Sequence, residues 1–130
     1  MISLDTNVIV RLLVADDADQ ARRARDLLAN SPVLVTTTVI LECEWVLRGA
    51  YAFKEHEIAD AFKRLFGLPQ LTLAEPNIVL PALNQLGQGM DFADALHLSG
   101  STDAEQFASF DRSLRKRAAR MVGLPTVIEP

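Results

Sequence analysis

The sequence predicts an α/β fold, in which a mostly parallel sheet is covered by helices on both faces. Short apolar runs alternate along the chain with longer amphipathic stretches, and no hairpin signal joins one run to the next. Strands that alternate with helices pair in parallel and are packed on both faces. The 130 residues contain no repeat, low-complexity stretch or long linker, so we expect a single domain over residues 1–130.

The first predicted element is the short apolar run that precedes Asp5. It offers no polar face to water, and we therefore expect it to be a buried strand in the middle of the sheet. Asp5 would then stand at the carboxyl end of a central strand, where open α/β sheets keep their active sites. Thr6 and Asn7 make the turn into a short apolar helix that ends near Val14.

The following elements alternate in the same way. Asp16, Asp17 and Asp19 precede a helix and suit its dipole, so we interpret them as capping and solvating residues and not as a metal site. Residues 33–37 are rich in β-branched side chains, as strands are. Further helices are predicted at 20–29, 38–50, 54–66, 76–86, 90–98 and 112–121, and further strands at 71–73, 106–110 and 126–128.

Two groups of side chains have an ordinary structural interpretation. Glu44 lies four residues before Arg48, which predicts a surface ion pair. A lone histidine in an apolar helix, His97, is expected to be packed and hydrogen-bonded. Most aromatic side chains fit core or dimer packing better than base stacking, because none forms a series on an exposed strand. They are Trp45, Phe62, Phe66, Phe92 and Phe107.

Composition excludes several classes of protein. The net charge of −4 is unlike the uniformly basic surface of a general nucleic-acid binder, although it allows a local basic patch. Cys43 is the only cysteine, so no internal disulfide forms. No apolar run is long enough to cross a membrane, and Asp5 and Arg11 interrupt the apolar start where a signal peptide would need continuity. We therefore expect a cytoplasmic protein.

Four carboxylates stand at related places in the predicted sheet. Asp5 and Asp111 directly follow strands, Glu42 lies about one turn into a helix after a strand, and Asp94 lies in the first turn of a helix. Because parallel strands share a direction, these acids are expected to converge at one edge. Each also has an ordinary interpretation alone, and Asp91 and Asp111 are good helix N-caps.

Convergence of these acids would require a cation. Two carboxylates about 5 Å apart repel by roughly 3 kcal/mol at an effective dielectric constant near 20. Oxygen ligands without Cys or paired His suit Mg²⁺ or Mn²⁺. Such a metal lowers the pKa of an attacking water and neutralises phosphate charge, which favours hydrolysis of phosphodiester bonds.

Four stretches of the sequence resemble the signature blocks of the PIN domain. They are Leu4-Asp5-Thr6-Asn7-Val8, Thr37-Thr38-Val39-Ile40-Leu41-Glu42, Asp91-Phe92-Ala93-Asp94-Ala95-Leu96 and Phe110-Asp111-Arg112. In length and block order the chain is most similar to the VapC-type ribonuclease toxins. The resemblance implies a three-layer α/β/α sandwich, Mg²⁺- or Mn²⁺-dependent cleavage of RNA, a homodimer, and inhibition by a small antitoxin protein that blocks the acidic site.

The resemblance also assigns roles to individual residues. Thr6 and Asn7 match small polar residues that order the turn or a metal-bound water, and Ser109 matches a hydroxyl position near the last acid. Asp91 either binds the metal or caps a helix, and we favour the cap. The residues that the resemblance makes catalytic and metal-binding are Asp5, Glu42, Asp94 and Asp111.

The basic helix after Asp111 has two interpretations. Its cations hold RNA phosphates beside the site, with Arg112 and Arg115 nearest to it, or they are solvated and complement the helix dipole.

Three other activities are weighed against the ribonuclease toxin. A phosphatase of the haloacid-dehalogenase type would use Asp5 as nucleophile, but such enzymes need a second Asp two residues later, where this chain has Asn7. A binding module without catalysis would have lost an acid, and all four positions are filled. A housekeeping RNA-processing nuclease of the same fold is a variant of the leading toxin hypothesis that the sequence leaves open.

Overall fold

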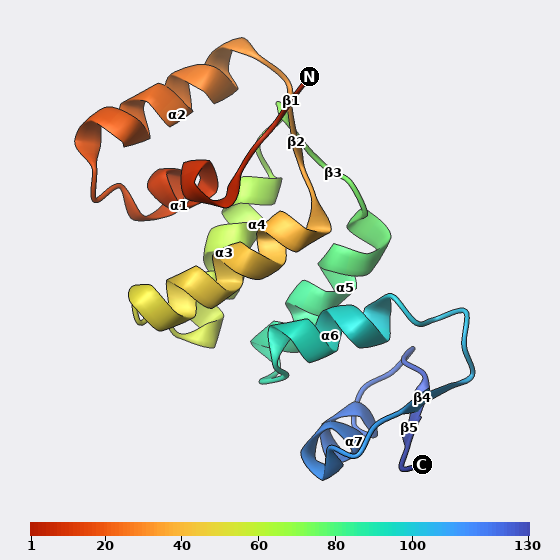
Figure 1. Ribbon diagram of the computed structural model, residues 1–130. Helices are drawn as coiled ribbons and strands as arrows, with labels where there is room; N and C mark the ends of the chain where they lie inside the picture. Colours follow the sequence, from red (N-terminus) through yellow and green to blue (C-terminus); the bar gives the residue numbers. More distant parts are fainter. The chain divides into compact units, whose positions relative to one another are not determined.

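The computed structural model describes all residues, 1–130, and Figure 1 labels its helices and strands. The chain divides into two compact units. The N-terminal unit is Met1–Pro76 and the C-terminal unit is Asn77–Pro130, and each is described by itself. Strands and helices alternate in both, and every strand pair is parallel, which confirms the predicted α/β class with parallel pairing. The expectation of a single domain over residues 1–130 stays a prediction.

The N-terminal unit contains a three-stranded parallel sheet in the order β1-β2-β3. Its strands are β1 (Ile2–Ser3), β2 (Val33–Val35) and β3 (Leu71–Leu73), and its helices are α1 (Thr6–Val14), α2 (Ala18–Asn30), α3 (Thr37–Ala50) and α4 (Glu55–Phe66). Val33 and Val35 of β2 are fully buried, as expected for the middle strand of a covered sheet.

The expected central position of the first strand is wrong for this sheet. β1 pairs only with β2, and both of its residues, Ile2 and Ser3, are exposed. A run of two paired residues is too short to distinguish a strand buried on both faces from an edge strand. The next residue, Leu4, is buried, and its backbone N–H donates to the Leu34 carbonyl at 3.0 Å. Asp5 therefore does follow the carboxyl end of β1.

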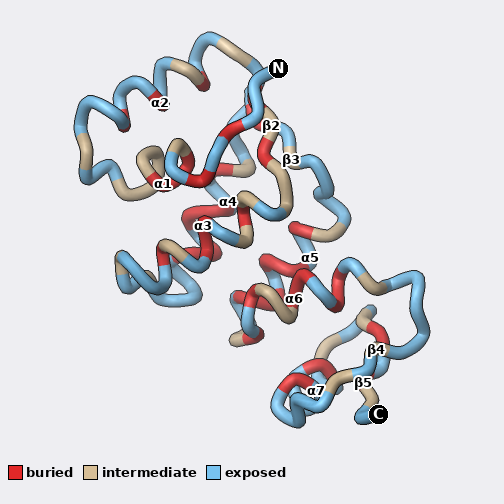
Figure 2. The backbone as a smooth tube through the Cα atoms, in the orientation of Figure 1, coloured by how far each residue is buried: buried red, intermediate tan, exposed pale blue.

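The helices of the N-terminal unit pack through one face each. α1 contacts both α2 and α3, and α4 contacts α3 and β3. In α3 the buried positions Ile40, Cys43 and Leu47 recur with helical spacing, while α2 buries only a narrow stripe (Figure 2). One residue of α3 differs from expectation, because Glu44 pairs with Arg48 at 2.9 Å but is 2% exposed and so is not a surface residue. Trp45 is 65% exposed and not in the core, so dimer packing of this side chain stays a prediction.

The other aromatic predictions are mostly confirmed. Phe62 and Phe92 are fully buried, while Phe66 and Phe107 are partly buried. Phe66 stacks on Phe62 with ring centroids 5.7 Å apart and an interplanar angle of 20°.

The C-terminal unit holds a two-stranded parallel sheet and three helices. β4 (Gln106–Ala108) pairs with β5 (Thr126–Ile128), and α7 (Arg112–Ala118) packs against β5. α5 (Pro76–Gly87) starts at the last residue of the N-terminal unit and is followed by α6 (Phe92–Ser99). A buried hydrogen bond from Gln85 Nε2 to Ser99 Oγ, 3.3 Å long, links these two helices.

The turn between α5 and α6 depends on a glycine. Gly89 has a φ of 94°, a left-handed conformation that other residues adopt only with strain. The turn lets the backbone N–H of Met90 donate to the Gln85 carbonyl at 3.0 Å and delivers the chain to Asp91, the N-cap of α6.

The buried aromatic pair of α4 gives a test of the core. Phe62→Ala is expected to lower the free energy of unfolding by about 3–5 kcal/mol, because it removes a fully buried ring and leaves a cavity. Leu68→Ala, at a side chain that is 40% exposed, is the control and should change stability far less. Urea unfolding measures both; equal losses would contradict the assignment of Phe62 to the core.

Candidate metal and active site

The structure gathers the predicted acids into two groups, one in each unit. In the N-terminal unit Asp5 and Glu42 line one cavity of about 280 Å³, which we call the acid pocket. Its polar lining also includes Thr6, Asn7, Arg11 and Tyr51. In the C-terminal unit the charges of Asp91, Asp94 and Asp111 act on one another.

Asp5 is held in place by the start of α1. As N-cap of this helix it has an extended backbone, and its Oδ1 accepts a hydrogen bond of 2.8 Å from the Thr6 backbone N–H. Thr6 is 7% exposed and packs into the unit, whereas Asn7 is exposed at the rim. The side chain of Asp5 itself is exposed, so one carboxylate oxygen is fixed while the group stays accessible from the pocket.

Glu42 lines the acid pocket from α3, and the next residue, Cys43, connects α3 to α1 through a hydrogen bond. The Cys43 thiol, which is fully buried, donates to the carbonyl oxygen of Thr6 at 3.8 Å. Burial, with a smaller contribution from the negative charges of Glu42 and Asp5, raises the pKa of Cys43 to about 12. Both carboxylates thus act electrostatically on the same small region between the two helices.

In the C-terminal unit, Asp94 is the acid under most electrostatic strain. Burial raises its pKa above the ordinary value, and the carboxylates of Asp91 and Asp111 add to this, while His97 and Arg117 oppose it. Asp91 is the N-cap of α6, and its Oδ2 accepts the backbone N–H of Asp94 at 3.1 Å, which confirms the predicted cap.

Asp111 has the opposite electrostatic setting. It is the N-cap of α7, and its Oδ1 accepts the hydroxyl of Ser113 at 2.9 Å and the backbone N–H groups of Ser113 and Leu114. These hydrogen bonds, the Ser113 hydroxyl first, lower the pKa of Asp111, and the charge of Arg117 helps. Ser109, predicted as a supporting hydroxyl, accepts the backbone N–H of Asp111 at 3.0 Å.

The sequence analysis missed Ser113, and it counted Arg117 only among the cations of the basic helix, without its effect on these acids. Ser113 follows Asp111 by two positions, where a hydroxyl commonly bonds an N-capping acid, and this spacing was a usable signal. Arg117 acts on both Asp94 and Asp111 and also donates through Nη1 to the Gly89 carbonyl. Its partner lies in the α5–α6 turn, far away in sequence, so local spacing gave no sign of it.

Three further residues of this unit were expected near the acids. Arg112 and Arg115 are exposed and form no ion pair, and their place nearest the site stays a prediction. His97, expected to be packed, is exposed, because α6 buries the flanking Leu96 and Leu98 against the unit. Its positive form would act on Asp94 from outside the core.

The donor atoms of both groups suit a hard divalent cation. All are carboxylate oxygens, which Mg²⁺ and Mn²⁺ prefer, and Mg²⁺ is commonly held by only one or two carboxylates together with water and substrate phosphates. No set of three or more His, Cys, Asp or Glu side chains is already arranged to hold a metal. Asp5 and Glu42 supply, within one pocket, the one or two carboxylates by which Mg²⁺ is commonly held.

Comparison with known families identifies the protein class. The PIN domain family model matches residues 2–120, which includes all of the acids described above, and the chain belongs to this family. PIN domains are generally metal-dependent nucleases. The search of curated proteins found no match. None of the helices has the length and apolar character that crossing a membrane requires.

The burial of Asp94 and its repulsion by neighbouring carboxylates predict a gain in stability when its charge is removed. Asp94→Asn should raise the Tm of the metal-free protein at pH 7, because the carboxylate is disfavoured above its raised pKa. The penalty disappears as the pH falls through that pKa, so the advantage of the variant should shrink between pH 7 and pH 3. Calorimetry in EDTA measures it, with Asp60→Asn as the exposed-acid control; a lower Tm at pH 7 would contradict the prediction.

Asp91 can be tested for a role beyond the cap. Asp91→Asn keeps the acceptor for the Asp94 backbone N–H and should keep stability within about 0.5 kcal/mol, whereas Asp91→Ala should lose about 1 kcal/mol. If Asp91 only caps α6, the stable Asn variant keeps its affinity for Mn²⁺ in calorimetric titration. A loss of that affinity without a loss of stability would make Asp91 a metal ligand.

Proposed function

We propose that the protein is a metal-dependent endoribonuclease that hydrolyses RNA phosphodiester bonds with Mg²⁺ or Mn²⁺ held by Asp5, Glu42, Asp94 and Asp111. The observation that best supports the proposal is the acid pocket. There, an acid that follows a parallel strand and an acid from the next strand's helix line one cavity in a chain of the PIN family.

Each residue has a role in this proposal. A bound divalent cation supplies charge neutralisation at the phosphate and a water of lowered pKa. Asp5 and Glu42 bind the cation from opposite helices, α1 and α3, so the close approach of these helices sets the distance between the carboxylates. The Thr6 backbone N–H orients Asp5, and Asn7 at the rim orients water or substrate.

The acids of the C-terminal unit complete the proposed ligand set. The Ser113 hydroxyl and two backbone N–H groups keep Asp111 ionised, and Ser109 holds the backbone of that turn. Asp94, whose pKa is raised, gains most from a nearby cation, because the cation offsets its repulsion from Asp91 and Asp111. Arg112 and Arg115, free of ion pairs on α7, are proposed to contact RNA phosphates.

Within the class of ribonucleases we propose the toxin of a type II toxin-antitoxin pair, acting in the cytoplasm as a homodimer. The support is the order of the four acidic blocks, which is most similar to the VapC-type toxins. A small cognate antitoxin would then inhibit the protein by covering the acidic site. A housekeeping RNA-processing nuclease would share the chemistry and would have no such partner.

The proposal is tested by cleavage of a panel of tRNA, ribosomal RNA and messenger RNA with purified protein in Mn²⁺, Mg²⁺ or EDTA. Cuts at defined sites should require the metal. Asp5→Asn and Asp94→Asn should each slow them by roughly 100-fold or more, because a charge that holds the cation is lost. Asp60→Asn, an exposed acid of α4 outside both groups, is the matched control and should cleave normally.

The same assay separates the alternatives. Phosphate release from p-nitrophenyl phosphate without RNA cleavage would favour the phosphatase with Asp5 as nucleophile. Absence of cleavage by folded protein that binds Mn²⁺ in calorimetry would favour the non-catalytic binding module. Growth arrest on expression, relieved by a protein encoded beside this one, would distinguish the toxin from a housekeeping nuclease.

A further inference from the structure

A second and larger cavity adjoins the acid pocket in the N-terminal unit. It has a volume of about 510 Å³ and lies between α1 and α2, and we call it the α1/α2 pocket. This volume falls within the range of roughly 300–1,000 Å³ that is usual for sites of small organic ligands. Its lining includes Asn7, Arg11, Gln20 and Arg23, with Val8 and Leu27 among the apolar residues.

The two pockets share part of their walls but differ in charge. Asn7 and Arg11 line both of them, so the cavities meet at these two side chains. The acid pocket carries the carboxylates of Asp5 and Glu42, whereas the α1/α2 pocket is lined by two arginines and no acid. A ligand that enters both pockets must therefore combine a group that binds a metal held in the acid pocket with an anionic group that pairs with the arginines of the α1/α2 pocket.

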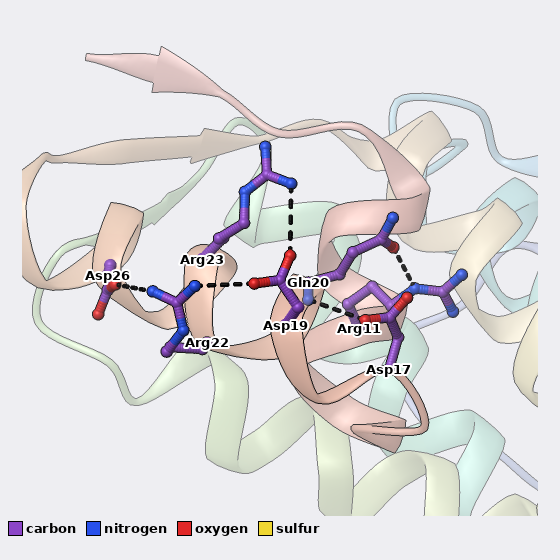
Figure 3. A network of polar contacts seen from close by, with 7 residues as sticks. All are labelled: Arg11, Asp17, Asp19, Gln20, Arg22, Arg23 and Asp26. Carbon is purple, nitrogen blue, oxygen red and sulfur yellow. Dashed lines mark hydrogen bonds and ion pairs between the residues drawn. The ribbon is translucent and has the colours of Figure 1, made fainter.

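Arg11 is fixed at the boundary between the pockets. Its Nε donates to Gln20 Oε1 at 2.6 Å, and its Nη1 donates to Asp16 Oδ1 at 3.1 Å (Figure 3 shows the contact with Gln20). Tyr51, at the end of α3, donates its hydroxyl to the other oxygen of Asp16 at 2.9 Å. Because α1, α2 and α3 all contribute to this network, the guanidinium is placed before any ligand arrives.

Arg23 is the available cation of the pocket. Its side chain is 70% exposed and its only ion pair, to Asp19, is 3.7 Å long. Arg22 approaches the same carboxylate from another side at 2.8 Å and also contacts Asp26 at 3.4 Å (Figure 3). Asp19 is therefore bound mainly by Arg22, and Arg23 can leave it for a phosphate at little cost, since such exposed pairs contribute little to stability.

We propose that the α1/α2 pocket binds one nucleotide of the RNA strand, next to the phosphate that lies in the acid pocket. Arg23 and Arg11 attract the phosphate groups, because guanidinium binds phosphate through paired hydrogen bonds. Val8 and Leu27 offer apolar contact to the base or ribose. The amide of Gln20 accepts from Arg11 and keeps its N–H groups to donate to a base edge.

This inference rests on the proposed ribonuclease function and adds to it a subsite for one nucleotide beside the acid pocket. A base within a duplex is stacked and paired, so it can enter a pocket between two helices only after it is released.

Nucleotide binding is measured first, without metal and without catalysis. The full chain in EDTA is titrated with AMP, CMP, GMP and UMP and observed by ¹⁵N NMR. We expect shifts at the backbone amides of Arg11, Gln20 and Ala24, and a Kd raised at least about 10-fold by Arg23→Glu. Arg25→Glu changes the same charge on the same helix, at an exposed residue outside the pocket lining, and should leave the Kd nearly unchanged.

A second arm uses the intact RNA. The Asp94→Asn variant, in which cleavage is suppressed by a substitution outside the α1/α2 pocket, is titrated with a single-stranded oligoribonucleotide at several salt concentrations. Arg23→Ala in this background should weaken binding and reduce the salt slope by about 0.7, as expected for one lost phosphate contact on a single strand. Arg25→Ala, outside the pocket lining, should keep the slope.

The outcomes separate this inference from the proposed function. Metal-dependent cleavage by the wild-type protein with equal effects of the Arg25 and Arg23 variants, or with no nucleotide shifts in the pocket, would overturn the nucleotide site and leave the ribonuclease intact. Shifts caused only by a partner protein would show a protein-binding groove instead. Pocket shifts that depend on Arg23, in a protein that cleaves no RNA, would keep the site and overturn the nuclease.

Discussion

The start of a helix leaves backbone N–H groups without partners, and much of this structure depends on how aspartates satisfy them. α1, α6 and α7 begin at Asp5, Asp91 and Asp111, and each side chain accepts a backbone N–H at the first turn. Each of these bonds uses one named oxygen, Oδ1 in Asp5 and Asp111 and Oδ2 in Asp91. The capping interaction thus fixes the carboxylate and leaves its second oxygen for other partners.

The sequence was informative wherever a local rule applied. Alternating apolar runs predicted the α/β class, strand ends located Asp5 and Asp111, and cap spacing identified Asp91. It failed where the cause was not local. β1 is an edge strand because it pairs with β2 alone. The two residues of β1 do not encode which strands lie beside it. Trp45 is exposed although tryptophan is usually buried. Glu44 is buried although its spacing of four residues from Arg48 is typical of a surface ion pair.

The candidate site shows the same division between local and distant causes. Residue type and position found the acids, but the electrostatic setting of each depends on other segments. The difference between Asp94 and Asp111 illustrates this, because the pKa of Asp94 is raised by burial and by neighbouring carboxylates, whereas the pKa of Asp111 is lowered by hydrogen bonds. Arg117 reaches the Gly89 carbonyl from α7, a contact that no spacing within either segment specifies.

The buried thiol of Cys43 allows the separation of α1 from α3 to be measured as a rate. With a pKa near 12 and no exposed surface, the thiol reacts with an alkylating reagent only when the two helices separate. Because it is the only cysteine in the chain, its rate of labelling records the opening of this one interface without interference from other sites. A cation that bridged Asp5 and Glu42 would hold the helices together. The rate of thiol labelling would then fall as the fraction of protein with bound cation rises.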